Sequence, residues 1–405
     1  MRELRAQRWG YDYNENPSPP PTLRQTEMAL NREGKKVLSL SPGDPPARGY
    51  LPPQWLMDAV TQAMKDGKHG YSAGRSPELP KAIAAYEKEF NGVDYEPRNI
   101  FLKPSSTSAM VQVYLALLDA GDEMISPEPI YQQYSFFGNY FKSKMRKARS
   151  FEEDRWQPDL DAVRKLVNDK TKFIIINNPN NPSGAVYDEK SLKGLIDIAG
   201  ENDILVFSDE IYVFLTYDIP KATSVAAVAK DVPVVLSNGM SKMWNITGWG
   251  VGYCAFYDPE NKMPNVAEAL RRVSSFLGRI AAPVYNAAIV GYQNWKRALK
   301  EVQPEIQDLR RRRDWLIKRI EEIDGITLTK PEGSMFCLPK VEAAFGKIWK
   351  DDVDFLVDLI KEELVTFVPG SNYYSPSHFR VGLLPTDTEL KEGFDRIERF
   401  MKKHL

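Results

Sequence analysis

The sequence predicts an α/β protein: a large domain with a mostly parallel sheet flanked by helices, plus a smaller α+β domain. From about residue 97 onward, short apolar runs alternate with helical stretches, the pattern of βαβ units around a parallel sheet. The length of 405 residues exceeds what one small core accommodates. A polar cluster follows each apolar run, as expected where strands lead into the loops of a ligand site.

The elements follow in order along the chain. The first segment, up to Pro21, is polar and proline-rich, so we expect an extended arm. The expected strands cover 100–102, 123–126, 172–176, 204–207 and 232–236, with helices between them such as 108–118 and 191–199. After about residue 285 we expect long charged helices and an α+β end. The predicted division is 1–50 for the arm and part of the small domain, 51–290 for the large domain, and 291–405 for the rest of the small domain.

Composition excludes several classes of function. Apolar residues make up 42% and charged residues 27%, and the net charge of −1 gives no bulk attraction to nucleic acid or to an anionic membrane. The one basic run, Arg310 to Arg313, lies in a helical pattern and is expected to be a solvated helix face. Within the same helical pattern, Ile306, Leu309, Leu316 and Ile320 form an apolar stripe.

Cysteine and histidine usage predicts neither a disulfide scaffold nor a metal site. Cys254 and Cys337 have no nearby partner in sequence, and the three histidines are scattered. The N-terminus shows no apolar signal segment, and no apolar stretch reaches the ~18 residues that span a bilayer. We therefore expect a cytoplasmic protein.

Five polar segments follow the five expected strands. In an open parallel sheet the carboxyl ends of the strands share one edge, where ligands bind. These segments should therefore converge on one crevice: Ser105-Ser106-Thr107, Pro127 to Tyr131, Asn177 to Gly184, Ser208 to Tyr212 and Asn238 to Lys242.

Lys242 and Asp209 are the candidates for covalent and electronic chemistry. A lysine forms an imine with an aldehyde only when unprotonated, and a loop at a strand end can lower its pKa; the alternative is a surface lysine. Asp209 ends an apolar strand and could pair with a protonated ring nitrogen, which turns a ring into an electron sink. The alternative for Asp209 is a helix N-cap. Tyr212, three residues on, could hydrogen-bond a ring phenolate or could simply be a packed aromatic.

The other polar segments suit a ring, a phosphate and a carboxylate. Four asparagines and two prolines within 177–184 predict a rigid turn with amide donors, although it could be only a turn. Tyr131 offers a flat face for stacking, or is a core residue. Ser105 to Thr107 precede a helix, where hydroxyls and backbone N–H groups bind phosphate or serve only as a cap. Arg380 lies in a short apolar strand and needs a carboxylate partner, either protein or substrate.

Together these residues closely resemble the fold-type I pyridoxal-phosphate (PLP) enzymes, in particular the class I/II aminotransferases related to aspartate and alanine aminotransferases. The resemblance runs from about Leu38 to the end with the motifs in the family's order. It implies a PLP-dependent aminotransferase that moves an amino group between an α-amino acid and a 2-oxo acid, with PLP as a Schiff base on Lys242. Spacing near 213–217 and the phrase His69-Gly70-Tyr71-Ser72 look more like the alanine-type branch.

The resemblance also implies roles for individual residues. Catalysis would fall to Lys242, Asp209 and Tyr212. Substrate binding would fall to Gly43, Asn181 and Arg380, with Arg380 holding the α-carboxylate. A homodimer is implied, in which Tyr71 reaches the partner subunit's phosphate. The cofactor contacts implied are Tyr71, Ser105, Ser106, Thr107, Tyr131, Asn181, Asp209, Tyr212, Ser241 and Lys242.

Two departures from the family bear on the phosphate site. The family usually has an arginine in a Gly-Trp-Arg segment, where this chain has Gly248-Trp249-Gly250. Its usual glycine-rich stretch is Pro104 to Thr107 here. A lost guanidinium removes a charge-assisted hydrogen bond worth ~1.5–3 kcal/mol, and Arg75 is a candidate replacement cation.

The departures leave open, as an alternative, a PLP-dependent amino-acid oxidase, lyase or cyclase. A non-catalytic regulator is a further alternative, although no basic DNA-binding segment is present.

Overall fold

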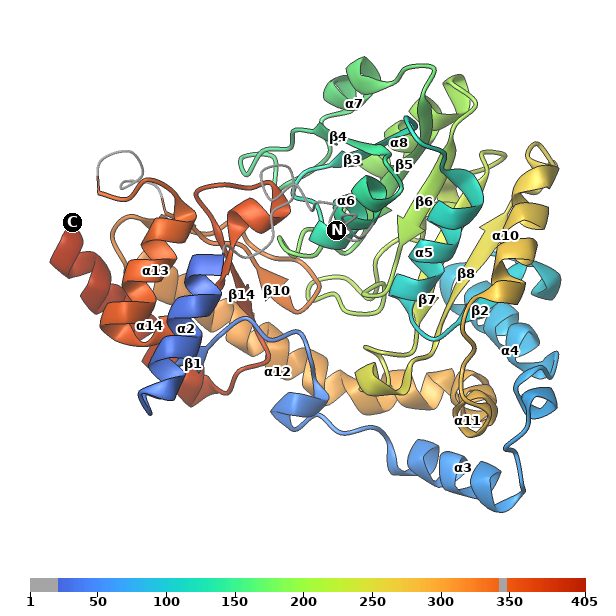
Figure 1. The fold of residues 1–405 in the computed structure, drawn as a ribbon, viewed down its shortest axis with the longest axis horizontal. Coiled ribbons are helices and arrows are strands. Elements are labelled where there is room, and N and C mark those ends of the chain that lie inside the picture. Colours follow the sequence, from blue (N-terminus) through green and yellow to red (C-terminus); the bar gives the residue numbers. More distant parts are fainter. Residues whose placement is uncertain (1–20, 342–347) are drawn as a thin grey trace, which may run out of the picture.

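The computed structural model describes residues 21–341 and 348–405, so the expected N-terminal arm lies almost entirely outside the described part of the chain. A seven-stranded sheet in the order β2-β8-β7-β6-β5-β3-β4 forms its centre (Figure 1). Only β8 runs antiparallel to its neighbours, so the prediction of a mostly parallel sheet is confirmed. The strands are β2 (Ile100–Lys103), β3 (Glu123–Pro127), β4 (Lys144–Ala148), β5 (Thr171–Asn177), β6 (Leu205–Asp209), β7 (Val234–Gly239) and β8 (Gly252–Tyr257).

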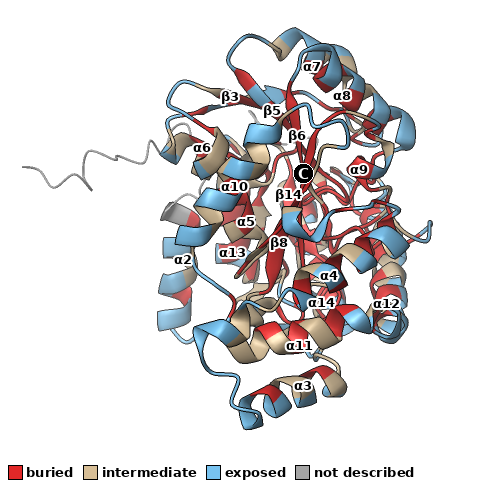
Figure 2. Cartoon of the chain, turned by 90° about the vertical axis from the view of Figure 1, so that its right-hand side faces the viewer, coloured by how far each residue is buried: buried red, intermediate tan, exposed pale blue. Residues whose placement is uncertain are grey.

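Helices cover both faces of this sheet because its inner strands are apolar on both sides. In β5, Phe173 and Ile175 pack toward α5, α6 and α10, whereas Ile174 and Ile176 pack toward the helices of the opposite face. Figure 2 shows the buried strands between helices whose outer surfaces are exposed. The helices of the first face are α5 (Ser106–Leu117), α6 (Gln132–Tyr140) and α10 (Pro264–Phe276). Those of the second are α4 (Glu78–Tyr86), α7 (Leu160–Leu166), α8 (Glu189–Glu201), α9 (Val225–Val228) and α11 (Ala282–Gln293), with α3 (Gln54–Lys65) packed against α11.

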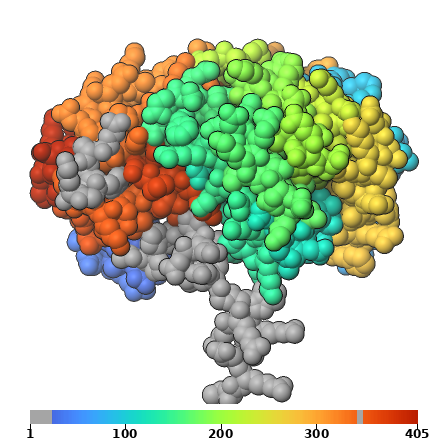
Figure 3. All heavy atoms as spheres, turned by 90° about the horizontal axis from the view of Figure 1, so that it is seen from above, coloured from blue at the N-terminus to red at the C-terminus, as the bar shows by residue number. Residues whose placement is uncertain are grey.

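The two ends of the chain meet in a second, smaller part. Strand β1 (Leu38–Ser39) pairs in parallel with β12 (Val365–Thr366), and α2 (Pro21–Arg32) packs on α13 (Asp352–Glu363). This pairing supports the proposed division at about residues 50 and 290, and Figure 3 shows the orange-to-red C-terminal part beside the green part of the sheet domain. The remaining elements here are β9 (Ile326–Thr327), β10 (Phe336–Cys337), β11 (Lys340–Val341), β13 (Val368–Pro369), β14 (Phe379–Gly382) and α14 (Asp387–His404).

Helix α12 (Trp295–Glu321) runs along both parts and corrects one expectation. Its four expected stripe residues are buried, but Arg313 is buried with them at 1% exposure. Its guanidinium donates to both carboxylate oxygens of Asp218, at 2.9 and 3.2 Å, and to the carbonyl of Pro331. The solvated-face prediction is therefore wrong for Arg313, because positions 306, 309, 313, 316 and 320 follow the three-and-four spacing of one helix face.

Among the described residues, no helix combines the length and the apolar character needed to cross a membrane.

Candidate active site

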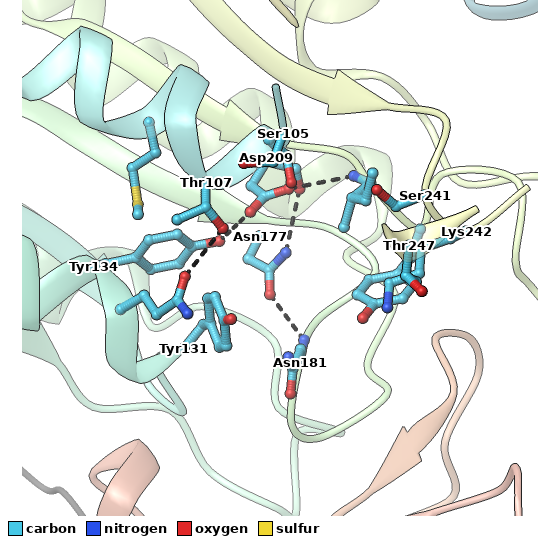
Figure 4. A pocket seen from close by; sticks show the side chains of 15 residues that line it. Ser105, Thr107, Tyr131, Tyr134, Asn177, Asn181, Asp209, Ser241, Lys242 and Thr247 are labelled. Atoms are coloured by element: carbon cyan, nitrogen blue, oxygen red, sulfur yellow. Dashed lines mark hydrogen bonds between the residues drawn. The ribbon is translucent and has the colours of Figure 1, made fainter. Parts of the chain in front are cut away.

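A cavity of about 230 Å³ lies at the carboxyl ends of the strands (Figure 4). The loops after β2, β3, β5, β6 and β7 all contribute to it, so the predicted convergence of the polar segments is confirmed. The predicted residues that line the cavity are Ser105, Ser106, Thr107, Tyr131, Asn181, Asp209, Tyr212, Ser241 and Lys242. Asn177 and Ile211, which belong to two of the predicted segments, line it as well. Residues that sequence reasoning did not single out also line it, namely Met110, Gln133, Tyr134 and Thr247.

Lys242 follows β7 in a turn that directs its amine into the cavity. Its Nζ donates a 2.7 Å hydrogen bond to the carbonyl oxygen of Gly43. Burial lowers the pKa of Lys242 to about 8, and nearby Asp44 opposes this shift only in part. Gly43 must lack a side chain, because a Cβ there would lie 2.6 Å from the ring of Phe336. The site therefore offers more neutral, nucleophilic amine near neutral pH than an ordinary lysine does.

Asp209 is a half-buried residue at the end of β6. Tyr134 donates its hydroxyl to Oδ2 at 2.7 Å, and the backbone N–H of Ile211 approaches Oδ1 at 3.3 Å. Burial raises the pKa of Asp209, and these two donors offset the shift only in part. The N-cap alternative is wrong, because a turn follows Asp209 and the next helix begins only at Val225. A cation placed against this carboxylate would be strongly favoured.

Tyr134 lines the cavity and contacts Asp209, but sequence reasoning did not single it out. It lies in the first turn of α6, three residues after Tyr131, and the two rings meet edge to face at 5.5 Å. The sequence signal for Tyr134 was its spacing of three residues from Tyr131, because residues three apart share one side of a helix.

Aromatic and amide side chains surround the amine. Lys242 Nζ lies 5.8 Å from the ring centroid of Tyr212, which packs edge-on against Phe336. Burial raises the pKa of Tyr212, so its hydroxyl stays protonated and can donate a hydrogen bond. The side chain of Asn177 accepts a 2.8 Å bond from the backbone N–H of Asn181 and fixes the loop that carries the Asn181 amide (Figure 4).

The start of α5 forms the candidate phosphate site. The helix begins at Ser106 and not at the expected Ser108, because the Ser105 hydroxyl accepts the N–H of Ser108 as an N-cap. Ser106 and Thr107 therefore occupy the first turn, where backbone N–H groups and the positive end of the helix dipole favour an anion. Ser241 and Thr247 line the same cavity. The signal for Thr247 was a hydroxyl residue just before the Gly248-Trp249-Gly250 segment.

Arg380 on β14 has no carboxylate partner among the described residues. Its guanidinium donates to Asn181 Oδ1 and to the Ser41 carbonyl, each at 3.1 Å, and lies over the ring of Phe336 at 4.0 Å. Its Nε is buried and has no hydrogen-bond partner. Of the two alternatives for its partner, a protein carboxylate is therefore not found, and a substrate carboxylate fits.

Tyr71 and Gly250, two positions that bear on the predicted phosphate site, do not line the cavity. Tyr71 is 85% exposed and does not line the cavity of its own chain, so its predicted role needs a second chain. Gly250 has a φ of 70° and contacts the turn before α5: a Cβ there would lie 2.6 Å from the Pro104 carbonyl oxygen. The missing arginine thus corresponds to a backbone that a side chain would disturb.

The residues of the cavity fit PLP. An amine of lowered pKa suits its aldehyde, and the carboxylate of Asp209 suits its ring nitrogen. The hydroxyl-rich start of α5 suits its phosphate. Sequence analysis found this combination because each polar segment directly follows a strand.

Comparison with known proteins agrees with this geometry. The model of the family "Aminotransferase class I and II" matches residues 35–397. An aspartate aminotransferase of Bacillus subtilis (strain 168) is 30% identical over 394 residues, with 96% of this chain and 97% of that protein covered. A glutamate-pyruvate aminotransferase of Haemophilus influenzae is 30% identical over 393 residues, with 94% and 95% covered.

Solved structures show the same similarity. An alanine aminotransferase from Pyrococcus furiosus superposes with a TM-score of 0.89 at 40% identity, over 95% of this chain and 98% of that one. A Thermus thermophilus aspartate aminotransferase superposes with a TM-score of 0.88 at 27% identity, over 98% and 100%. The chain therefore belongs to the class I and II aminotransferase family and is a PLP-dependent enzyme that transfers an amino group between amino acids and 2-oxo acids.

Proposed function

We propose that Lys242 is both the residue that binds PLP covalently and the base of the reaction. Its lowered pKa and its hydrogen bond to the Gly43 carbonyl support this role, because they supply a neutral amine in a fixed position. When bound, PLP supplies an aldehyde that captures the substrate amine and a ring that withdraws electrons from Cα. Lys242 Nζ, once free of the cofactor, would act as the base that takes the proton from the substrate Cα and holds it for return.

The ring and the phosphate are assigned to the side chains that surround Lys242. Asp209 holds the proton on the ring nitrogen, and Tyr134 fixes the orientation of that carboxylate through its 2.7 Å hydrogen bond. Asn181 and Tyr212 donate to the ring oxygen, and Tyr131 covers one ring face. The phosphate is held by four hydroxyl residues, Ser105, Ser106, Thr107 and Ser241. The side chains assigned to the ring and to the phosphate line one cavity together with Lys242, and this shared cavity is the observation that carries the proposal.

Arg380 is proposed to bind the α-carboxylate of every substrate, beside Gly43 and Asn181. The guanidinium already has one N–H on Asn181 and one on Ser41, and its buried Nε has no partner. A substrate carboxylate would satisfy that donor and neutralise the charge.

The substrate is proposed to be of the alanine type. The phrase His69-Gly70-Tyr71-Ser72 and the spacing near 213–217, which resemble the alanine-type branch, support this choice. The similarity to the alanine aminotransferase from Pyrococcus furiosus, at 40% identity, supports the same choice.

A half-reaction experiment tests these assignments. The PLP-loaded enzyme is mixed with excess alanine or aspartate, without any 2-oxo acid, and the cofactor absorbance is followed. We expect alanine to convert the cofactor once per site, after which the reaction stops until pyruvate is added. Continuous turnover without an acceptor would support the oxidase, lyase or cyclase alternative. Faster conversion by aspartate than by alanine would contradict the proposed specificity.

We further propose that the enzyme is a cytoplasmic homodimer in which Tyr71 of each chain reaches the phosphate site of the partner. An 85% exposed tyrosine on a short 3-10 helix, Tyr71–Gly74, supports this assignment, because so large an exposed ring is available to a second chain. Light scattering during size-exclusion chromatography tests it: a mass of one chain would contradict the homodimer.

A further inference from the structure

The candidate phosphate site is short of positive charge. Of the described residues that line the cavity, Lys242 is the only cation, and its amine is committed to the cofactor aldehyde in the proposed function. The start of α5, Ser241 and Thr247 offer neutral donors. The position of the family's arginine is Gly250, whose left-handed backbone abuts the Pro104 carbonyl. A phosphate dianion bound here would lack the guanidinium that usually neutralises such a group.

The arginine at position 75 is exposed and has no ion pair among the described residues. Arg75 directly follows the 3-10 helix that carries the exposed Tyr71, and its guanidinium has no ion pair and no hydrogen bond with residues 21–341 or 348–405. It borders a cavity of about 390 Å³ with four other cations and no carboxylate among the described lining residues. Of those four, Arg98 and Arg271 are paired with glutamates, and the others are Lys103 and Arg279.

The turn that carries Arg75 is held firmly in place. The side chain of Asn286 on α11 donates to the Ala73 carbonyl at 2.9 Å, and the Tyr285 hydroxyl donates to the Ser76 carbonyl. These bonds flank Arg75 on both sides. The backbone that carries the Arg75 guanidinium is therefore fixed in place. A residue that reaches into the site of another subunit needs such a fixed backbone.

Lys103, which lies just before the start of α5, is poorly placed to replace the family's arginine. Lys103 immediately precedes Pro104 and the start of α5, but it is 1% exposed and its ammonium donates to the Ser274 carbonyl at 3.0 Å. Burial lowers the pKa of Lys103 to about 8. It borders the second cavity and not the one that holds Lys242. Lys103 is therefore not the cation that replaces the family's arginine.

We propose that Arg75 of one subunit neutralises the cofactor phosphate bound by its partner, in place of the arginine that Gly250 excludes. The inference rests on the proposed homodimer and on PLP binding at Lys242. A phosphate site short of a cation and an unpaired arginine beside Tyr71 are complementary in charge. The second copy of this chain is thus the occupant that the Tyr71–Arg75 surface fits.

The first test measures the affinity of apoenzyme variants for PLP and for pyridoxal, which has no phosphate. Arg75→Ala should weaken PLP binding on the order of tenfold to a hundredfold and leave pyridoxal binding unchanged, while Arg75→Lys should restore part of the loss. Arg98→Ala is the matched control, because Arg98 borders the same cavity but is paired with Glu96. Equal weakening of PLP and pyridoxal, or no weakening of PLP by Arg75→Ala, would overturn the proposal.

A mixed dimer determines which chain supplies the arginine. One subunit carries Lys242→Ala and the other carries Arg75→Ala, so only the second subunit can bind PLP covalently. If Arg75 acts across the interface, that subunit receives an intact Arg75 from its partner and binds PLP with wild-type affinity. Weak binding in the mixed dimer would place Arg75 in its own site and overturn the proposal. Covalent binding in a dimer with Lys242→Ala in both subunits would instead overturn the proposed role of Lys242.

Discussion

Replacing Gly250 with arginine puts back the residue that the family usually carries and asks whether this chain can accept it. The backbone at Gly250 has φ 70° and ψ 62°, a left-handed conformation that costs an L side chain about 1–2 kcal/mol. A Cβ there would lie 2.6 Å from the Pro104 carbonyl oxygen, closer than real Cβ contacts. Pro104 directly precedes Ser105, so any shift reaches the phosphate site.

The strained backbone and the close contact with Pro104 both predict a loss of stability and of PLP affinity. We expect Gly250→Arg to lower the free energy of unfolding by about 2 kcal/mol. PLP binding should weaken by about tenfold, since a displacement worth ~1.4 kcal/mol at the start of α5 corresponds to that factor. Thermal unfolding of the apoenzyme gives the first quantity, and titration of the apoenzyme with PLP gives the second.

Gly248→Ala is the matched control two residues earlier. A Cβ at Gly248 would meet nothing within 4 Å, so this variant should keep wild-type stability and affinity. Tighter PLP binding by Gly250→Arg, with unchanged unfolding, would refute the steric argument and show that an arginine simply fits.

Three further predictions concern single side chains. Asp209→Ala should still bind PLP but lose at least about a hundredfold in turnover, because the ring nitrogen loses its carboxylate; near-wild-type turnover would leave Asp209 with a structural role only. Arg380→Ala should raise the apparent KM for amino acids and 2-oxo acids about tenfold to a hundredfold and leave the cofactor absorbance unchanged; an unchanged KM would refute the carboxylate role. Asp218→Ala should destabilise by about 3 kcal/mol because the buried Arg313 loses its bidentate carboxylate partner, whereas Arg313→Met should cost less. The bond from Arg313 holds the pKa of Asp218 below its usual range. The stability that this carboxylate contributes is therefore present above about pH 4 and falls as the pH drops below that. Denaturant unfolding at pH 7 and pH 3 measures both effects.

The strands of the sheet centre were predictable because their environment is uniform. Strands β5, β6 and β7 are buried on both faces and read as continuous apolar runs. Strand β4 was not predicted, because Lys144–Ala148 is an edge strand with three exposed or half-buried basic residues. Strand β8 was not predicted either, although Gly252–Tyr257 is apolar. Its antiparallel insertion between β2 and β7 breaks the βαβ order on which the prediction relied.

Site residues at strand ends were predictable, whereas those set by packing were not. Asp209 and Lys242 follow apolar runs directly, so their position at the sheet edge is implied by sequence order alone. Tyr134 and Thr247 reach the cavity from the side of a helix and from a turn, which depends on three-dimensional placement. Arg313 was assigned to solvent because charge outweighed periodicity in the prediction, and its bidentate pairing with the distant Asp218 is what permits its burial.

The central claim is that Lys242 carries the cofactor, and one labelling measurement tests it most directly. The PLP-loaded enzyme is reduced with borohydride, which fixes the carbon–nitrogen bond between cofactor and lysine, and is then digested and mapped. We predict that the label is on Lys242 alone, and that Lys242→Ala takes up none. Because the pKa of Lys242 is lowered to about 8, PLP uptake by the apoenzyme should rise as the pH increases through about 8. Label on any other lysine, with wild-type uptake by Lys242→Ala, would contradict the account.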